Sequence, residues 1–486
     1  MSNFETVIGI EVHAQLSTKT KLFGSSSTQF GDKPNSNVDP VCLGLPGALP
    51  VLNKEAVRMA VMAGLALNCK IRLQSVFSRK NYFYPDLPKG YQISQFDKPI
   101  CEDGFLDIEV NGKIKRIGIT RIHMEEDAGK LVHQGAESIA GATHSHVDLN
   151  RAGTPLIEIV SEPDIRSAEE AKAYMEALRQ IVQHIGVCDG NMDEGSLRAD
   201  ANISIRPVGS EAFGTRTEVK NLNSFRSLER AINVERNRQI ELVESGGEVV
   251  QETRNYDDNT QTTSSLRSKE DAHDYRYFPE PDLPPLVLTE AYVNDIKELL
   301  PELPKVKAGR YQSEYGLSDF ECKVLLNDIS IDRYFNNCVH LVDSHLVKEV
   351  CKWIVGDFNA LLKEATDCFE STKVKPEQIV ELVVLIDKGT ISGKMAKDIL
   401  AKMVETGERP EKLVAESGGG QISDENALQE VVVQILKENM DVVEKIKAGK
   451  TNSANFLMGQ VMKATKGKAK PDLVRDLILS TVSSQF

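Results

Sequence analysis

The proline-rich run at residues 278–285 (FPEPDLPP) separates two parts of the chain with different residue patterns. Before it, short segments of alternating apolar and polar residues lie between Gly, Pro, Asn and Asp clusters, which is typical of β-strands. After it, apolar residues recur at helical spacing. We therefore predict an α+β multidomain chain, mostly β and then all-α, with the proline-rich run as a stiff connector.

The expected elements follow from these periodicities. Strands are predicted at residues 6–16, 105–110, 115–125, 155–160, 199–206 and 215–222. Two helices interrupt them, at 54–67 and at 167–185, where Ser167 and Glu170 have the spacing of a capping box. Further helices are predicted at 291–300, 346–365, 376–386, 393–406 and 426–448.

Length and composition limit the domain count and the setting. The 486 residues suggest about three domains, which we place at 1–290, 291–416 and 417–486, with the glycine-rich stretch near 417–421 as the second boundary. Eight cysteines occur without a CxxC motif, as expected in a reducing cytoplasm. No signal peptide and no membrane span are predicted. The net charge of −14 argues against a general coating of nucleic acid.

Acidic residues recur on the polar faces of the predicted strands. Side chains alternate along a strand, so Glu11 shares a face with His13, and Asp200 shares one with Asn202. Glu125 lies on one face with His123 and Arg121, and Glu218 lies on one face with Lys220. Two interpretations stay open for these strands: a solvated polar face on a half-buried sheet, or a cluster that binds a metal ion.

Glu158 is the most informative of these acids because apolar residues flank it on both sides, in PLIEIV. An ionised carboxylate in such a strand is costly unless a cation or hydrogen-bond donors meet it. Carboxylates with one imidazole suit Mg²⁺ or Mn²⁺ better than a structural zinc ion.

A second candidate segment, at residues 78–92, combines basic and aromatic residues. Arg79, Lys80 and Lys89 alternate with three tyrosines and two prolines, a combination that can bind a phosphate and stack a base. A packed surface loop with exposed lysines is the alternative. The GTISGK segment at 389–394 is one residue short of a phosphate-binding loop, and we interpret it as a turn between helices.

The C-terminal segment from residue 441 reverses the charge of the chain, because basic residues outnumber acidic ones there by eight to four. Such a patch suits binding to a phosphate backbone, although a lysine-rich helix pair with no nucleic-acid role has the same composition. The lysines that we expect to contact nucleic acid, called the tail lysines below, are Lys463, Lys466, Lys468 and Lys470.

Six long motifs resemble those of one known family. They read VIGIEVHAQL (7–16), SRKNYFYPD (78–86), HMEEDAGK (123–130), DLNRAGTPLIEIVSEPD (148–164), GSLRADAN (195–202) and DYRYFPEPDL (274–283). The chain resembles, over essentially its whole length, the B subunits of tRNA-dependent aspartyl/glutamyl amidotransferases.

The resemblance implies an architecture and an activity. It implies a β cradle domain with the kinase and transamidase site, a helical domain and a YqeY-like tail that contacts tRNA. It also implies a heterotrimer with an amidase A subunit, which releases ammonia from glutamine, and a small C subunit. The expected reaction is ATP- and Mg²⁺-dependent amidation of Glu on tRNA(Gln), Asp on tRNA(Asn), or both.

The same resemblance implies roles for individual residues, all of which except Lys220 lie inside the six motifs. The implied metal-site residues are Glu11, His13, Glu125, Glu158 and Asp200, with Glu11 either a ligand or a neighbour of the ligands. The implied catalytic residues are Glu125, Glu158, Asp200 and Lys80. The residues expected to contact nucleotide or carboxylate are Lys80, Arg151, Asn202 and Lys220.

One departure concerns zinc. Some members of the family carry four cysteines near the N-terminus, but here the corresponding places read Gly24-Ser-Ser26 and Asp39-Pro-Val-Cys42. Because three of four ligands are missing, a tetrahedral site cannot close, and we predict no zinc. Two other functions compete with the kinase and amidotransferase reading: a tRNA-binding scaffold without chemistry, and a metal-dependent phosphodiesterase.

Overall fold

The computed structural model describes residues 3–135, 142–268, 275–416, 425–447, 453–465, 469 and 471–485. The chain forms two compact units, residues 1–304 and 305–486. The first contains a large sheet, whereas the described regular elements of the second are all helices. The predicted α+β class, with a mostly β part before an all-α part, is confirmed. The boundaries proposed at residues 290 and 416 stay predictions.

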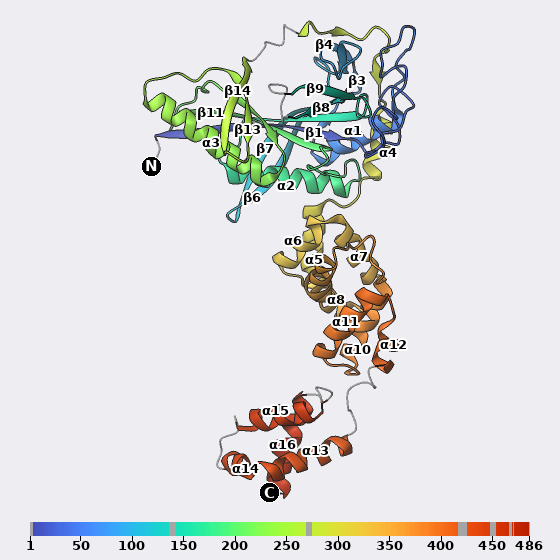
Figure 1. The fold of residues 1–486 in the computed structure, drawn as a ribbon, viewed down its shortest axis with the longest axis vertical. Coiled ribbons are helices and arrows are strands. Elements are labelled where there is room, and N and C mark those ends of the chain that lie inside the picture. The colour runs from blue at the N-terminus through green and yellow to red at the C-terminus, as the bar shows by residue number, and fades with distance from the viewer. Residues whose placement is uncertain are drawn as a thin grey trace. The chain divides into compact units, whose positions relative to one another are not determined.

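The first unit contains a large sheet (Figure 1). This sheet has nine described strands in the order β14-β13-β12-β11-β1-β10-β7-β6-β2. All neighbours are antiparallel except β12 and β13. The strands are β1 (Phe4–Gln15), β2 (Lys70–Ile71), β6 (Cys101–Val110), β7 (Lys113–Glu126), β10 (Pro155–Ser161), β11 (Leu197–Pro207), β12 (Thr217–Leu222), β13 (Glu252–Asp257) and β14 (Thr262–Ser268). Every strand predicted from the sequence is present, with ends shifted by a few residues.

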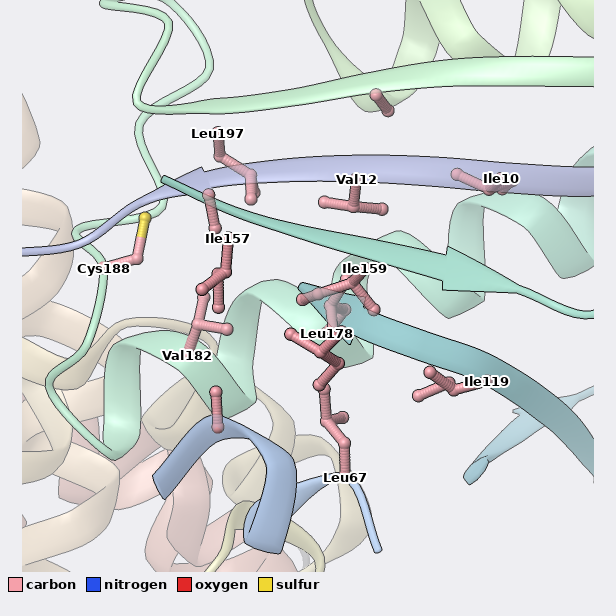
Figure 2. Close-up of a cluster of buried hydrophobic side chains, with 14 of the residues drawn as sticks. Ile10, Val12, Leu67, Ile119, Ile157, Ile159, Leu178, Val182, Cys188 and Leu197 are labelled. Atoms are coloured by element: carbon pink, nitrogen blue, oxygen red, sulfur yellow. The ribbon is translucent and has the colours of Figure 1, made fainter. Parts of the chain in front are cut away.

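One face of this sheet is apolar and is covered by helices. They are α1 (Lys54–Ala66), α2 (Ala168–His184) and α3 (Phe225–Glu244), which pack on β6 and β7, on β6, and on β11 and β12 respectively. Figure 2 shows Leu178 and Val182 of α2 beside Ile157 and Ile159 of β10, all of them buried. Burial of this apolar layer leaves the opposite face of the sheet to the polar side chains.

Two helices of the first unit differ from the prediction: α2 lacks the complete capping box, and α3 was not predicted at all. Ser167 caps α2 by accepting a hydrogen bond from the Glu170 amide (3.2 Å), but the Glu170 carboxylate accepts from the amide of Arg166 rather than that of Ser167. Helix α3 was not predicted, because its buried face includes Glu235 and Gln239, which break the apolar periodicity.

Smaller elements extend the first unit. They are β3 (Gln74–Ser75), β4 (Ser78–Asn81), β5 (Tyr91–Ser94), β8 (Lys130–Gln134), β9 (His144–Asp148), β15 (Phe278–Pro279), β16 (Leu286–Val287) and α4 (Glu290–Glu298). β15 pairs with β4 and β16 with β3, and Arg79 makes a two-pronged ion pair with Glu280. The prediction of a stiff connector is therefore wrong: the proline-rich run is part of the first unit, where short edge pairings tolerate proline.

The second unit contains helices with two separate apolar cores. The first core joins α5 (Pro304–Tyr315), α6 (Asp319–Asn327), α7 (Ile329–Val339), α8 (Val347–Trp353), a π-helical turn (Ile354–Phe358), α9 (Asn359–Glu364), α10 (Pro376–Asp387), α11 (Gly393–Thr406) and α12 (Pro410–Glu416). The second joins α13 (Glu425–Glu438), α14 (Met440–Lys447), α15 (Ala454–Ala464) and α16 (Pro471–Gln485). Within the described ranges, no helix is long and apolar enough to cross a membrane.

Candidate active site

Three polar residues stand directly opposite one another across the centre of the sheet. In the pairing register, His13 of β1 faces Glu158 of β10, and Glu158 faces His123 of β7. The Nε2 atoms of His13 and His123 lie 3.4 and 3.3 Å from Oε2 of Glu158. This arrangement explains how Glu158 is accommodated at only 9% exposure among apolar neighbours.

Glu125 completes this group because it lies two residues after His123 on β7 and therefore points to the same face. Its carboxylate is 3.8 Å from His13 Nε2 and 3.7 Å from His123 Nε2, and it accepts a hydrogen bond from Ser94 Oγ (3.3 Å). His13, Glu125 and Glu158 each offer a ligand atom, and these atoms all lie within 4.8 Å of one another. We call these three residues the central cluster.

The electrostatics of the central cluster suit a bound cation. Burial alone would raise the pKa of Glu158, but the neighbouring His123 and His13 hold it well below its usual range. Burial alone would lower the pKa of His123, but the Glu158 charge and hydrogen bonds to both carboxylates raise it to about 9. The donor set of two carboxylates and an imidazole suits Mg²⁺ or Mn²⁺, which would displace imidazole protons in balancing these charges.

Two further predicted acids lie beside the central cluster. Glu11 faces Asp200 across the pairing of β1 with β11, and its Oε1 accepts a hydrogen bond from Asn202 Nδ2 (2.8 Å). Burial and the nearby carboxylates of Glu158, Glu218 and Asp200 raise the pKa of Glu11. Asp200 Oδ2 accepts from Lys220 Nζ (2.6 Å), so this carboxylate already has a cationic partner.

Two of the predicted basic residues, Lys80 and Lys220, lie beside these acids. Lys220 bridges Asp200 and Glu218, at 2.6 and 3.2 Å. Lys80 Nζ lies 5.0 Å from the centre of the Tyr275 ring; burial opposes its charge, but Glu125 and other nearby groups raise the pKa of Lys80.

Arg151, in contrast, lies away from these side chains. Its guanidinium donates to the carbonyls of Ala128 (2.9 Å) and Gly129 (2.6 Å), and lies 3.7 Å from Asp127. The Asp127 carboxylate also accepts hydrogen bonds from the side chains of Arg198 and Gln15. The structure thus brings together the predicted acids, His13, Asn202, Lys80 and Lys220, and places Arg151 in a neighbouring ion-pair network.

A cavity of about 360 Å³ lies over this polar face. Its wall includes Tyr275 and Tyr277, and the Tyr277 ring stacks on Phe96 with ring centres 4.2 Å apart. Sequence reasoning did not assign a role to His123, Arg121, Arg216, Tyr275 or Tyr277, all of which line the cavity. The alternation that pointed to Glu125 also placed His123 and Arg121 on its face, whereas the only signal for the tyrosines was their place in the DYRYFPEPDL motif.

The remaining predicted residues lie elsewhere. Of the tail lysines, Lys463 is exposed in the last turn of α15, and Lys466, Lys468 and Lys470 fall outside the described residues. At the four positions considered for zinc, Asp39 accepts hydrogen bonds from Ser26 Oγ (2.7 Å) and the Cys42 amide (3.0 Å). Burial raises the pKa of Cys42 to about 11, and this single thiol cannot by itself supply the four ligands of a structural zinc site. The absence of zinc stays a prediction.

A buried group of acids and imidazoles under a polar cavity is the arrangement expected of an enzyme site. Residues 6–294 match the family model described as the GatB/GatE catalytic domain, and residues 333–482 match the GatB domain model.

Full-length relatives agree with these matches. The chain is 55% identical to the B subunit of the aspartyl/glutamyl-tRNA(Asn/Gln) amidotransferase of Geobacter sulfurreducens, over 98% of this chain and 99% of the relative. It is 53% identical to the protein of that name from Geotalea uraniireducens (99% of each) and 50% to that from Trichodesmium erythraeum (98% of this chain, 97% of the relative). The chain therefore belongs to the family of aspartyl/glutamyl-tRNA amidotransferase B subunits, which are parts of a carbon–nitrogen ligase.

Proposed function

We propose that this chain activates and amidates the side-chain carboxylate of Glu on tRNA(Gln), of Asp on tRNA(Asn), or of both. A carboxylate is a poor electrophile, so amide formation at neutral pH requires an activated acyl group. A carboxylate oxygen attacks the γ-phosphorus of ATP, and ADP leaves. Ammonia then attacks the acyl carbon of the acyl phosphate, inorganic phosphate leaves, and the amide remains.

The central cluster supports this proposal most strongly. His13, Glu125 and Glu158 would hold Mg²⁺, which supplies charge neutralisation for phosphoryl transfer when it is bound. Lys80 and Lys220 add positive charge at the same cavity, where they would hold anionic oxygens of nucleotide and substrate in position. Neither lysine has to form a covalent bond with the substrate, because phosphoryl transfer depends mainly on positioning and electrostatic stabilisation.

Ammonia is proposed to come from a partner. Among the described residues that line the cavity there is no cysteine, and the sequence has no recognisable glutaminase signature. We therefore propose an amidase A subunit as the ammonia source and a small C subunit as the third member of a cytoplasmic heterotrimer. The relatives are themselves named as one lettered subunit of an amidotransferase, which supports an assembly of several chains.

Glu158→Gln tests the proposal in the complex reconstituted with the A and C subunits. We expect the variant to lose phosphate release that depends on misacylated tRNA, while tRNA binding is retained. Glu162→Gln is the matched control, because Glu162 is exposed just beyond the end of the same strand. A Glu158→Gln complex with normal phosphate release and transamidation would support the scaffold alternative instead, and cleaved tRNA would support the phosphodiesterase.

A further inference from the structure

Three histidines lie on the two-stranded sheet formed by β8 and β9, which is separate from the large sheet. They are His133 on β8 and His144 and His146 on β9. The chemistry proposed above uses none of them, because it is confined to the central cluster and its cavity. Imidazole is also the side chain that most often binds transition metals.

The strand geometry divides these histidines between the two faces of the hairpin. His144 and His146 are two residues apart on β9, so their side chains project from the same face. His133 pairs in register with Ser145, projects from the other face, and forms a hydrogen bond with Ser145 Oγ (2.7 Å). We call His144 and His146 the histidine pair.

The two rings of the histidine pair have a separation that suits a shared metal ion. Their centres are 5.1 Å apart, and their planes make an angle of 82°. An imidazole nitrogen lies about 1.1 Å from its ring centre and about 2.0 Å from a bound Zn²⁺, so two imidazoles on one tetrahedral ion have centres about 5.2 Å apart. The spacing along β9 therefore places both rings where one tetrahedral ion can bind them.

The surroundings of the histidine pair also suit a metal ion. Both side chains are exposed, so water can complete the coordination. The Thr143 hydroxyl lies 3.1 Å from Nδ1 of His144 and can accept a hydrogen bond from it. A histidine bonded in this way presents the Nε2 lone pair to a metal. Among the described residues, no other hydrogen bond and no ion pair involves either imidazole.

We propose that the histidine pair binds one divalent transition-metal ion of the kind that imidazole prefers, with Zn²⁺ as the best match to the ring separation. Because the chain supplies two ligands and water the others, the ion would be exchangeable. This site is distinct from the positions at residues 24–42, where we predict no structural zinc.

The histidine pair and the central cluster should select different ions. The central cluster has two carboxylates and one imidazole, a donor set that suits Mg²⁺ or Mn²⁺. The histidine pair has two imidazoles and no carboxylate within the described ligand groups, so it should discriminate against Mg²⁺ and Mn²⁺. Excess Mg²⁺ should therefore leave the histidine pair free for Zn²⁺. The inference does not depend on the proposed function.

Isothermal titration calorimetry tests the proposal. Zn²⁺ is titrated into the chelator-treated full chain in excess Mg²⁺. We expect His144→Ala and His146→Ala each to weaken Zn²⁺ binding by about tenfold or more, because each removes a ligand. His133→Ala is the matched control: it removes the same side chain from the other face of the same hairpin, and it should leave the Zn²⁺ affinity unchanged.

A second variant separates the two metal sites. His13→Ala removes the imidazole of the central cluster, and Zn²⁺ binding at the histidine pair should persist in it. Equal Zn²⁺ affinities of the wild type and the folded His144→Ala and His146→Ala variants would overturn the proposal. So would loss of Zn²⁺ binding in His13→Ala alone, which would assign the ion to the central cluster.

Discussion

Leu178→Ala tests whether the large sheet separates a structural face from a chemical face. Leu178 of α2 is fully buried beside Ile159 of β10 (Figure 2). Because side chains alternate along a strand, Glu158 and its register partner His13 point to the opposite face of the sheet. The substitution removes three buried carbons, worth about 2.4 kcal/mol at ~0.8 kcal/mol each. The cavity left behind adds roughly 1 kcal/mol, so we expect a loss of about 3 kcal/mol in the free energy of unfolding.

The assay is differential scanning calorimetry of the full chain, followed by activity of the reconstituted complex at 25 °C. A loss of about 3 kcal/mol should lower the Tm of the first unit by about 5 °C. Leu299→Ala makes the same chemical change at a residue that is 64% exposed, and it should shift the Tm very little. Activity per folded molecule should stay normal. The two-face reasoning fails if Leu178→Ala reduces activity while the Tm is unchanged.

Three other predictions address the site, the tail and the core. Mn²⁺ titration of chelator-treated protein, followed by electron paramagnetic resonance, should show binding that His13→Ala weakens by about tenfold or more; equal affinities would exclude His13 as a ligand. Replacing the four tail lysines with alanine should make the slope of log tRNA affinity against log salt concentration shallower by about 0.9 for each lost phosphate contact. An unchanged slope would show that these lysines do not contact the tRNA backbone. Glu235→Gln should cost about 3 kcal/mol in urea unfolding, because fully buried Glu235 pairs with Arg238 and Arg254; exposed Glu241→Gln, expected to be neutral, is its control.

The sequence was most informative where structure depends on neighbouring residues. Alternation along β1, β7 and β11 correctly placed Glu11 with His13, Glu125 with His123, and Asp200 with Asn202. What it could not supply was the order of the strands, because β1 pairs with β10 and β11, which lie about 150 and 190 residues further along the chain. The row from His13 through Glu158 to His123 exists only because of that distant pairing.

The errors also have physical causes. The proline-rich run was interpreted as a connector because proline disfavours sheet interiors, yet Phe278 and Pro279 pair with the short strand β4 at the edge of a small sheet. Helix α3 was missed because a buried network around Glu235 replaces part of its apolar stripe. Arg151 lies in a matching motif, but its guanidinium is engaged by backbone carbonyls outside the cavity.

The most direct test of the account is ATP hydrolysis by the complex reconstituted with the A and C subunits in Mg²⁺, with and without misacylated tRNA. We predict phosphate release that requires Glu-tRNA(Gln) or Asp-tRNA(Asn) and that disappears in Glu158→Gln. If neither tRNA stimulated phosphate release, this chain would be a scaffold, and another enzyme would have to activate the carboxylate.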